Sequence, residues 1–155
     1  MRSVIFPGSF DPFTSGHADL VRRALEIFDQ VVIAIGYNVA KPGWIPVDER
    51  VRALRELYSA EPRVKVVSYD TLTVDAAREH GTRIILRGVR SMQDYEYEMR
   101  MADTNRQLDG IETVVLFAGS QYAHISSSTV RELHHFGRDI TQFLPGGLRY
   151  KFQDT

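Results

Sequence analysis

The sequence predicts an α/β protein, a doubly wound parallel sheet of five strands with helices on both faces. Two observations lead to this fold class. Five short apolar runs alternate with segments whose apolar residues recur at helical spacing, the pattern of repeated strand–helix units. The run at residues 31–37 is apolar throughout, as expected of a strand covered on both sides. We find no repeat or linker, so residues 1–155 are expected to form a single domain.

Three apolar runs in the first half of the chain are expected to be strands, because each is short and bounded by turn residues. They span residues 4–6, 31–37 and 64–69. The segments that follow them carry apolar residues at helical spacing and are expected to be helices. These span residues 17–28, 48–59 and 73–80. Asp48 is expected to cap the second helix, and Gly81 to end the third.

The second half of the chain continues the alternation. Strands are expected at residues 83–86 and 113–118, helices at 94–108 and 126–136, and one or two short helical turns after Asp139. Because every strand is followed by a helical crossover, the strands are expected to run parallel, with helices on both faces of the sheet.

Composition excludes several classes of protein. A hydrophobic content of 43% with 25% charged residues is ordinary for a soluble globular chain. The net charge of −1 gives no support for nucleic-acid binding through overall charge, and no apolar run approaches the roughly 20 residues of a membrane helix. The chain lacks cysteine and a charged leader followed by an apolar stretch. We therefore expect a cytoplasmic protein that binds neither nucleic acid nor membrane.

An anion site is expected between the first strand and the first helix. A strand, a glycine-bearing loop and a helix N-terminus follow one another, so free N–H groups and the positive helix end face one point. Gly8 and Gly16 permit close approach of the backbone. His17 stands in the first helical turn, where it can donate to a phosphoryl oxygen beside Ser9. The alternative is an ordinary loop with a capping histidine.

Basic residues follow two other strands. Arg87 and Arg90 come directly after the expected fourth strand, and guanidinium groups match phosphate oxygens at any working pH. Lys41 lies in the loop after the second strand, where its charge could neutralise phosphoryl oxygens. The alternatives are a solvated basic turn and a solvated lysine.

Two helices carry polar side chains that suit a ligand. Ser126 to Ser128 open the last long helix with hydroxyls and free N–H groups, which suit a second anion site, although one serine would suffice as a cap. Glu98 and Asn105 share one face of the helix from Asp94 and could bind a ribose, an adenine or a polar ligand chain. The alternatives there are a solvated charged face or a subunit contact.

The candidate residues converge on one edge of the predicted sheet. Ligands of open parallel sheets bind outside the carboxyl ends of the strands, and each candidate loop follows such an end. In strand order they are Ser9 and His17, Lys41, Thr73, Arg87 and Arg90, and the run Tyr122 to Ser128. No spacing of histidine or paired carboxylates predicts a metal site held by the protein itself.

These motifs resemble a known family. Gly8-Ser-Phe-Asp-Pro, followed by Thr14-Ser-Gly-His17, is similar to the signature of the nucleotidyltransferase superfamily, whose fold is Rossmann-like, and Ile125 to Arg131 matches its second signature. With the Lys41 loop and the segment Arg87-Gly-Val-Arg followed by Asp94-Tyr-Glu-Tyr-Glu-Met, the chain resembles the bacterial phosphopantetheine adenylyltransferase family. That resemblance implies adenylyl transfer from ATP to 4′-phosphopantetheine by in-line attack, without a covalent enzyme intermediate, giving dephospho-coenzyme A and pyrophosphate.

The resemblance also implies roles for residues and partners. His17 would stabilise the transition state, aided by Lys41 and Ser9. The residues expected to contact ATP are Ser9, Phe10, His17, Gly88, Val89, Arg90, Glu98, Tyr122, Ala123, His124, Ile125, Ser126, Ser127 and Ser128. Those expected to contact 4′-phosphopantetheine are Ser9, Lys41, Thr73, Arg87 and Asn105. Mg²⁺ would bind through ATP, the protein would be a homohexamer, and coenzyme A would be a feedback inhibitor.

Two residues depart from the family pattern. Ser9 stands where many members have threonine, which preserves the hydroxyl, and His124 stands where an aromatic residue is common. Two rival functions also stay open. The rivals are a cytidylyltransferase that uses glycerol phosphate, and a nucleotide-binding module without catalysis.

Overall fold

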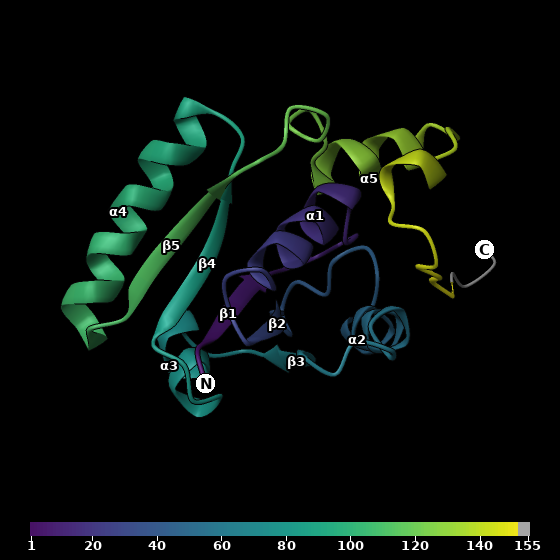
Figure 1. Ribbon diagram of the computed structural model, residues 1–155. Coiled ribbons are helices and arrows are strands. Elements are labelled where there is room, and N and C mark those ends of the chain that lie inside the picture. The colour runs from purple at the N-terminus through teal and green to yellow at the C-terminus, as the bar shows by residue number, and fades with distance from the viewer. Residues whose placement is uncertain (152–155) are drawn as a thin grey trace.

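The computed structural model describes residues 1–151, which contain a five-stranded parallel sheet in the order β3-β2-β1-β4-β5 (Figure 1). The strands are β1 (Ser3–Gly8), β2 (Gln30–Gly36), β3 (Val64–Tyr69), β4 (Ile84–Val89) and β5 (Glu112–Phe117). All four strand pairings are parallel, which confirms the predicted fold class.

Helices cover both faces of this sheet, as the strand–helix alternation predicts. They are α1 (Ser15–Ala24), α2 (Val47–Leu57), α3 (Thr73–Glu79), α4 (Met92–Asp109) and α5 (Ser127–His135), followed by a 3₁₀ turn at Thr141–Phe143. Alternate residues of β1 point to opposite faces: Val4 and Phe6 pack with α1 and α2, whereas Ile5 packs with α3. No helix in residues 1–151 is long and apolar enough to cross a membrane.

The sheet changes its winding direction at β1. The chain builds outward from β1 to β2 and β3, then crosses to the other side of β1 to form β4 and β5 (Figure 1). The loops after β1 and β4 therefore leave in opposite directions and open a crevice between the carboxyl ends of these strands. This crevice is the expected position of a ligand.

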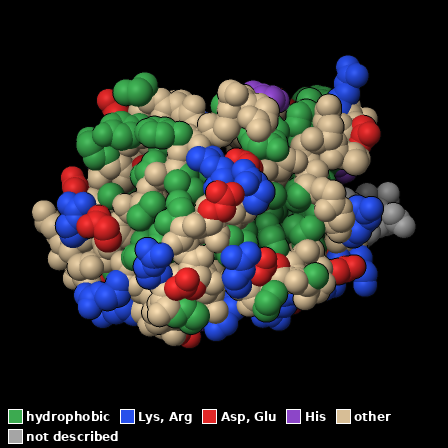
Figure 2. Space-filling view, in the orientation of Figure 1, with side chains coloured by type: hydrophobic (Ala, Val, Ile, Leu, Met, Phe, Trp, Pro, Cys, Tyr) green, Lys and Arg blue, Asp and Glu red, His purple; other side chains and the backbone are tan. Residues whose placement is uncertain are grey.

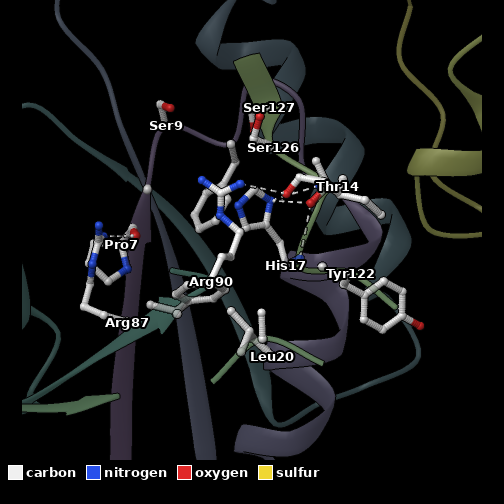
Figure 3. Close-up of a pocket in the computed structure, with 17 residues that line it drawn as sticks. Pro7, Ser9, Thr14, His17, Leu20, Arg87, Arg90, Tyr122, Ser126 and Ser127 are labelled. Atoms are coloured by element: carbon white, nitrogen blue, oxygen red, sulfur yellow. Dashed lines mark hydrogen bonds between the residues drawn. The ribbon is translucent and has the colours of Figure 1, made fainter. Parts of the chain in front are cut away.

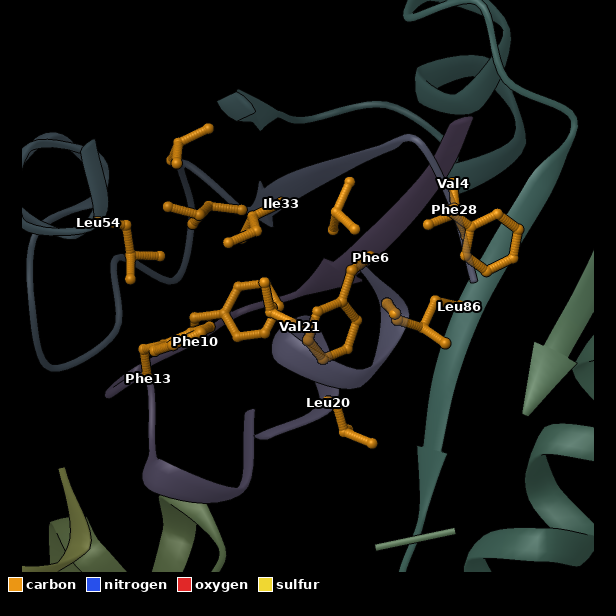
Figure 4. Packing of buried hydrophobic residues seen from close by; sticks show 14 of the residues in the cluster. Val4, Phe6, Phe10, Phe13, Leu20, Val21, Phe28, Ile33, Leu54 and Leu86 are labelled. Atoms are coloured by element: carbon orange, nitrogen blue, oxygen red, sulfur yellow. The ribbon is translucent and has the colours of Figure 1, made fainter. Parts of the chain in front are cut away.

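Aromatic rings fill the base of the loop that follows β1. The rings of Phe6 and Phe10 lie 5.1 Å apart between centroids, and those of Phe10 and Phe13 lie 5.3 Å apart (Figure 4). Phe10 adopts a positive φ of 48°, which turns its ring under β1. A Cβ at Gly8 would lie 2.9 Å from that ring, so the close packing requires glycine.

Several predicted boundaries are wrong. The first helix ends at Ala24 and not Phe28, because the N–H groups of Ile27 and Phe28 both bond to the Ala24 carbonyl in tight turns. Asp48 lies inside α2, whose N-cap is Pro46. Residues 87–89 of the predicted loop 87–90 belong to β4, because they pair in register with residues 115–117 of β5. The predicted stop at Gly81 is confirmed by its φ of +71°.

Candidate active site

A cavity of about 260 Å³ opens in the crevice between β1 and β4, and we call it the central cavity (Figure 3). Its walls come from the loop after β1, the start of α1, the end of β4 and the start of α5. The predicted site residues that line it are Ser9, Phe10, His17, Arg87, Gly88, Arg90, Tyr122, Ile125, Ser126 and Ser127. Three segments far apart in the sequence, within residues 6–20, 87–90 and 118–127, thus meet at the sheet edge.

A capping box holds the His17 ring in one orientation. The Thr14 side chain accepts from the backbone N–H of His17, and the backbone N–H of Thr14 donates to His17 Nδ1 over 3.0 Å. Because Nδ1 is the acceptor in this bond, the single proton of the neutral ring must lie on Nε2. His17 is therefore set to donate one hydrogen bond from Nε2 to a ligand in the cavity.

The surroundings of His17 keep its ring uncharged. Burial, and then the positive charges of Arg90 and Arg87, lower the pKa of His17 from 6.5 to about 4. Phe10 and Phe13 contribute to this burial, with ring centroids 5.0 and 5.4 Å from the imidazole. At neutral pH the ring is thus a neutral hydrogen-bond donor.

The two arginines at the end of β4 have different surroundings. Arg87 donates from Nε and Nη2 to both carboxylate oxygens of Glu98, at 2.9 and 2.8 Å, and from Nη1 to the Pro7 carbonyl. Arg90 makes a looser ion pair of 3.5 Å with Asp94 and a long bond to the Ile125 carbonyl. The positive charge of Arg90 is therefore less neutralised by protein groups than that of Arg87.

The start of α5 supplies donors to the same cavity. Ser126 is the N-cap and accepts from the Thr129 N–H. This serine therefore caps the helix, which was the alternative to a role in anion binding. Ser127 Oγ donates to the Pro12 carbonyl over 2.7 Å and fastens α5 to the first loop. The first N–H groups of a helix have no partner within it, so this end suits an anion.

Two further cavities adjoin the central one. The side cavity, about 280 Å³, lies between α3 and α4 and is lined by Arg87, Thr73, Glu98 and Asn105 together with apolar side chains. The outer cavity, about 460 Å³, is lined by Ser9, Lys41 and Thr73. Arg87 lines the central and side cavities, Ser9 the central and outer cavities, and Thr73 the side and outer cavities. The three cavities therefore share one rim.

The structure does not bring every predicted residue to this rim. Val89, Ala123, His124 and Ser128 line none of the three cavities. Glu98 is buried, its carboxylate accepts from Arg87, and it lines the side cavity but not the central cavity that His17 lines. The predicted contacts of these residues with ATP stay predictions.

Sequence reasoning missed three residues that shape the site. Thr14 and His17 form an N-terminal capping box in which histidine replaces the usual glutamate, a spacing that could have been recognised. Arg50 lies on the inward face of α2, three and four residues before Ala53 and Leu54, and it is buried. Asp11, also buried, lies within the signature Gly8-Ser-Phe-Asp-Pro but was given no role of its own.

The fold and the site define the class of protein. The cytidylyltransferase-like family model matches residues 5–133. Among solved structures, a bifunctional NMN adenylyltransferase/ADP ribose pyrophosphatase from Francisella tularensis, complexed with AMP and a Mn ion, superimposes with a TM-score of 0.66. It is 16% identical and covers 92% of this chain and 44% of its own, so this likeness concerns the fold alone. The chain is a nucleotidyltransferase of Rossmann-like fold.

Curated relatives narrow the family. A phosphopantetheine adenylyltransferase from Phocaeicola vulgatus is 51% identical over 149 residues, covering 96% of this chain and 99% of the relative. Another, from Bacteroides fragilis, is 49% identical over 148 residues, with 96% and 99% covered. One from Methylococcus capsulatus is 47% identical over 148 residues, with 95% and 91% covered. This chain belongs to the phosphopantetheine adenylyltransferase family.

Proposed function

We propose that this protein, as a single domain, transfers the adenylyl group of ATP to 4′-phosphopantetheine, giving dephospho-coenzyme A and pyrophosphate. The observation that carries the proposal is the place of His17. Its neutral ring, held by Thr14, lines the central cavity together with Ser126 at the start of α5 and with Arg87, which also lines the side cavity. A donor fixed between two binding regions suits a group transfer from one to the other.

ATP would occupy the central cavity. Arg90 and the N-terminus of α5 would hold the β- and γ-phosphates, because the charge of Arg90 is little neutralised and the helix end is positive. The nucleoside would lie along Gly88, Tyr122 and Ile125, which line the same cavity.

The acceptor would occupy the shared rim and the side cavity. Its phosphate would lie among Ser9, Lys41, Thr73 and Arg87, which line the adjoining parts of the outer and side cavities. Its pantetheine arm would run along the apolar wall of the side cavity toward Asn105. That wall is formed by Leu72, Val74, Met101, Ala102 and Leu108.

The reaction would be a direct displacement. An oxygen of the acceptor phosphate attacks the α-phosphorus of ATP, and the bond from that phosphorus to the bridging oxygen breaks, releasing pyrophosphate. The nucleophile is already an anion, so no general base and no covalent enzyme intermediate are required. His17 Nε2 and Lys41 would hold the oxygens on which charge develops, which is positioning and electrostatic stabilisation.

Mg²⁺ would enter with ATP. The residues that line the central cavity include no carboxylate, and residues 1–151 contain no group of three side chains suited to hold a metal ion. These residues fit an ion whose ligands are phosphate oxygens and water. When bound, the ion would neutralise part of the triphosphate charge.

Exposed apolar side chains of α4 are suited to contacts between subunits. Met92, Tyr95, Tyr97 and Met99 of α4 are exposed, and apolar side chains gather over the region of α4 in Figure 2. Such a surface supports subunit contacts, and we propose a cytoplasmic homohexamer. Coenzyme A carries the same pantetheine arm as the acceptor, so it would compete for the side cavity as a feedback inhibitor.

Pyrophosphate release tests the function. Release from Mg-ATP should require 4′-phosphopantetheine, and CTP or glycerol phosphate should not replace either substrate. Release with another pair would retain the class and refute the substrates, whereas binding of ATP without any release would favour the non-catalytic module. His17→Ala should lower kcat by roughly 10²–10³ with little change in KM for ATP, as when one transition-state donor is removed.

A further inference from the structure

Two buried charges have no part in the proposed reaction. Asp11 and Arg50 are 6% and 3% exposed. Asp11 belongs to the loop after β1, and Arg50 belongs to α2. Both lie against the segment 38–46, which joins β2 to α2 and carries Lys41.

The Asp11 carboxylate ties the first loop to this segment. Its Oδ2 accepts from the backbone N–H of Trp44, and its Oδ1 accepts from the backbone N–H of Ile45, each over 2.8 Å. Two bonds from one buried carboxylate fix both the distance and the orientation between the two loops. Arg131 extends this framework to α5, because its Nη1 donates to the Asp11 carbonyl over 2.7 Å.

Arg50 ties α2 to the same two loops. Its Nε donates to the Ile45 carbonyl over 2.8 Å, and its Nη1 donates to the Ser9 carbonyl over 2.6 Å. Burial lowers the pKa of Arg50, and the neighbouring negative charge of Asp11 opposes that shift. The guanidinium fork therefore holds the backbone of the residue that carries the Ser9 hydroxyl.

Gly43 brings the constraint close to Lys41. Its φ is +78°, and a Cβ there would lie 2.7 Å from Asp11 Oδ2. Only glycine suits both the backbone conformation and the close approach of the carboxylate. Lys41 lies two residues earlier, in a tight turn in which its N–H donates to the Asn38 carbonyl over 2.9 Å.

We propose that Asp11 and Arg50 form a positioning clasp, which sets Ser9 and Lys41 at a fixed separation before either substrate binds. The clasp rests on the proposed function in so far as these two residues bind the acceptor phosphate. It acts through backbone groups, so Asp11 and Arg50 are positioning residues. Loosening the clasp should weaken binding of the acceptor and lower the rate of the chemical step. Binding of ATP by Arg90 and the start of α5 should be little affected.

Steady-state kinetics of Arg50→Met test the clasp, with Arg52→Met as the matched control. Arg52 lies on the same helix, pairs with Glu49 and Glu56 and donates to the Arg149 carbonyl, so its bonds do not join α2 to either loop. Misplacement of reacting groups by about 1 Å costs on the order of 10²-fold in rate. We expect Arg50→Met to lower kcat roughly 10- to 100-fold and to raise KM for 4′-phosphopantetheine, with the Kd for ATP little changed. Arg52→Met should match the wild type in kcat, in KM for 4′-phosphopantetheine and in Kd for ATP.

Trp44 gives a readout that does not depend on turnover. It is the single tryptophan of the chain, and its ring lies 4.8 Å from that of His134. Loosening of the segment 38–46 should increase quenching of its fluorescence by acrylamide in Arg50→Met. Gly43→Ala, which retains every charge, should increase it as well. If the wild type is inactive with these substrates, the proposed function fails, and quenching alone still decides whether the clasp holds the loop.

Three results would overturn the clasp. One is wild-type kcat and quenching in folded Arg50→Met. Another is an equal loss of affinity for ATP and for the acceptor, which would indicate general damage to the site. The third is wild-type behaviour of Gly43→Ala. Thermal unfolding of each variant shows whether the measurements were made on folded protein.

Discussion

Protonation of His17 should make the protein less stable in mild acid. The pKa of His17 is about 4 in the folded protein, against an ordinary value of 6.5 in the unfolded chain. Between these values the unfolded chain binds a proton that the folded protein does not. The free energy of unfolding therefore falls as the pH drops from about 6.5 toward 4, and this loss is absent above 6.5.

The size of the effect follows from the shift. A difference of roughly two and a half pKa units corresponds to about 3 kcal/mol once the pH lies below both values. At pH 5 the unfolded ring is almost fully charged and the folded ring is almost fully neutral, which gives about 2 kcal/mol. This is a large part of the stability of an ordinary domain.

Urea unfolding at pH 7.5 and pH 5.0 measures this difference, with His17→Gln as the matched control. Glutamine is a usual partner at this position of a capping box and does not titrate, so the helix start is retained. The wild type should lose about 2 kcal/mol more than His17→Gln between the two pH values. Equal losses in the two proteins would refute the buried neutral ring, as would an NMR titration of the His17 ring near pH 6.5.

Two further substitutions test the packing around the site. Gly88→Ala should lower the free energy of unfolding by about 1–3 kcal/mol, because the new Cβ would lie 2.5 Å from Leu20 Cδ1. In a Leu20→Ala background, Gly88→Ala should lower this free energy by less. Equal losses in the two backgrounds, measured by urea unfolding, would contradict the contact. Arg87→Met should cost about 2–3 kcal/mol, because it leaves the buried Glu98 carboxylate without its partner. Adding Glu98→Gln should recover part of that loss, and a double-mutant cycle without coupling would contradict the pair.

The fold was largely predictable because its signals are local. The apolar run at residues 64–69 coincides with β3, and Gly81 ends α3 as its backbone freedom allows. The end of β4, which includes Arg87 and Gly88, was not predictable, because glycine is a poor strand former on its own. They are strand residues because β5 pairs with them, and such pairing involves residues distant in the sequence.

Several of the predicted site residues line one cavity, whereas the contacts among them were not predicted. Each candidate loop follows a parallel strand, so topology alone brings Ser9, His17 and Arg90 to one cavity. The bidentate pair of Arg87 with Glu98 joins a strand to a helix eleven positions along the chain. Sequence spacing gives the face of a helix but not the partner across a cavity, so Glu98 was expected to contact a ligand, solvent or another subunit, and its pairing with Arg87 was not predicted.

The site is held by hydrogen bonds between residues close in the sequence and by hydrogen bonds between residues far apart in it. The neutral donor at His17 depends on a hydrogen bond to Thr14, three positions away, so a short segment is enough to specify it. The separation of Ser9 and Lys41 depends on contacts that span 33, 34 and 41 positions. Those contacts exist only when β1, β2 and α2 are assembled. The proposed acceptor site therefore depends on the complete fold, whereas the orientation of the His17 ring is set within a single helical turn.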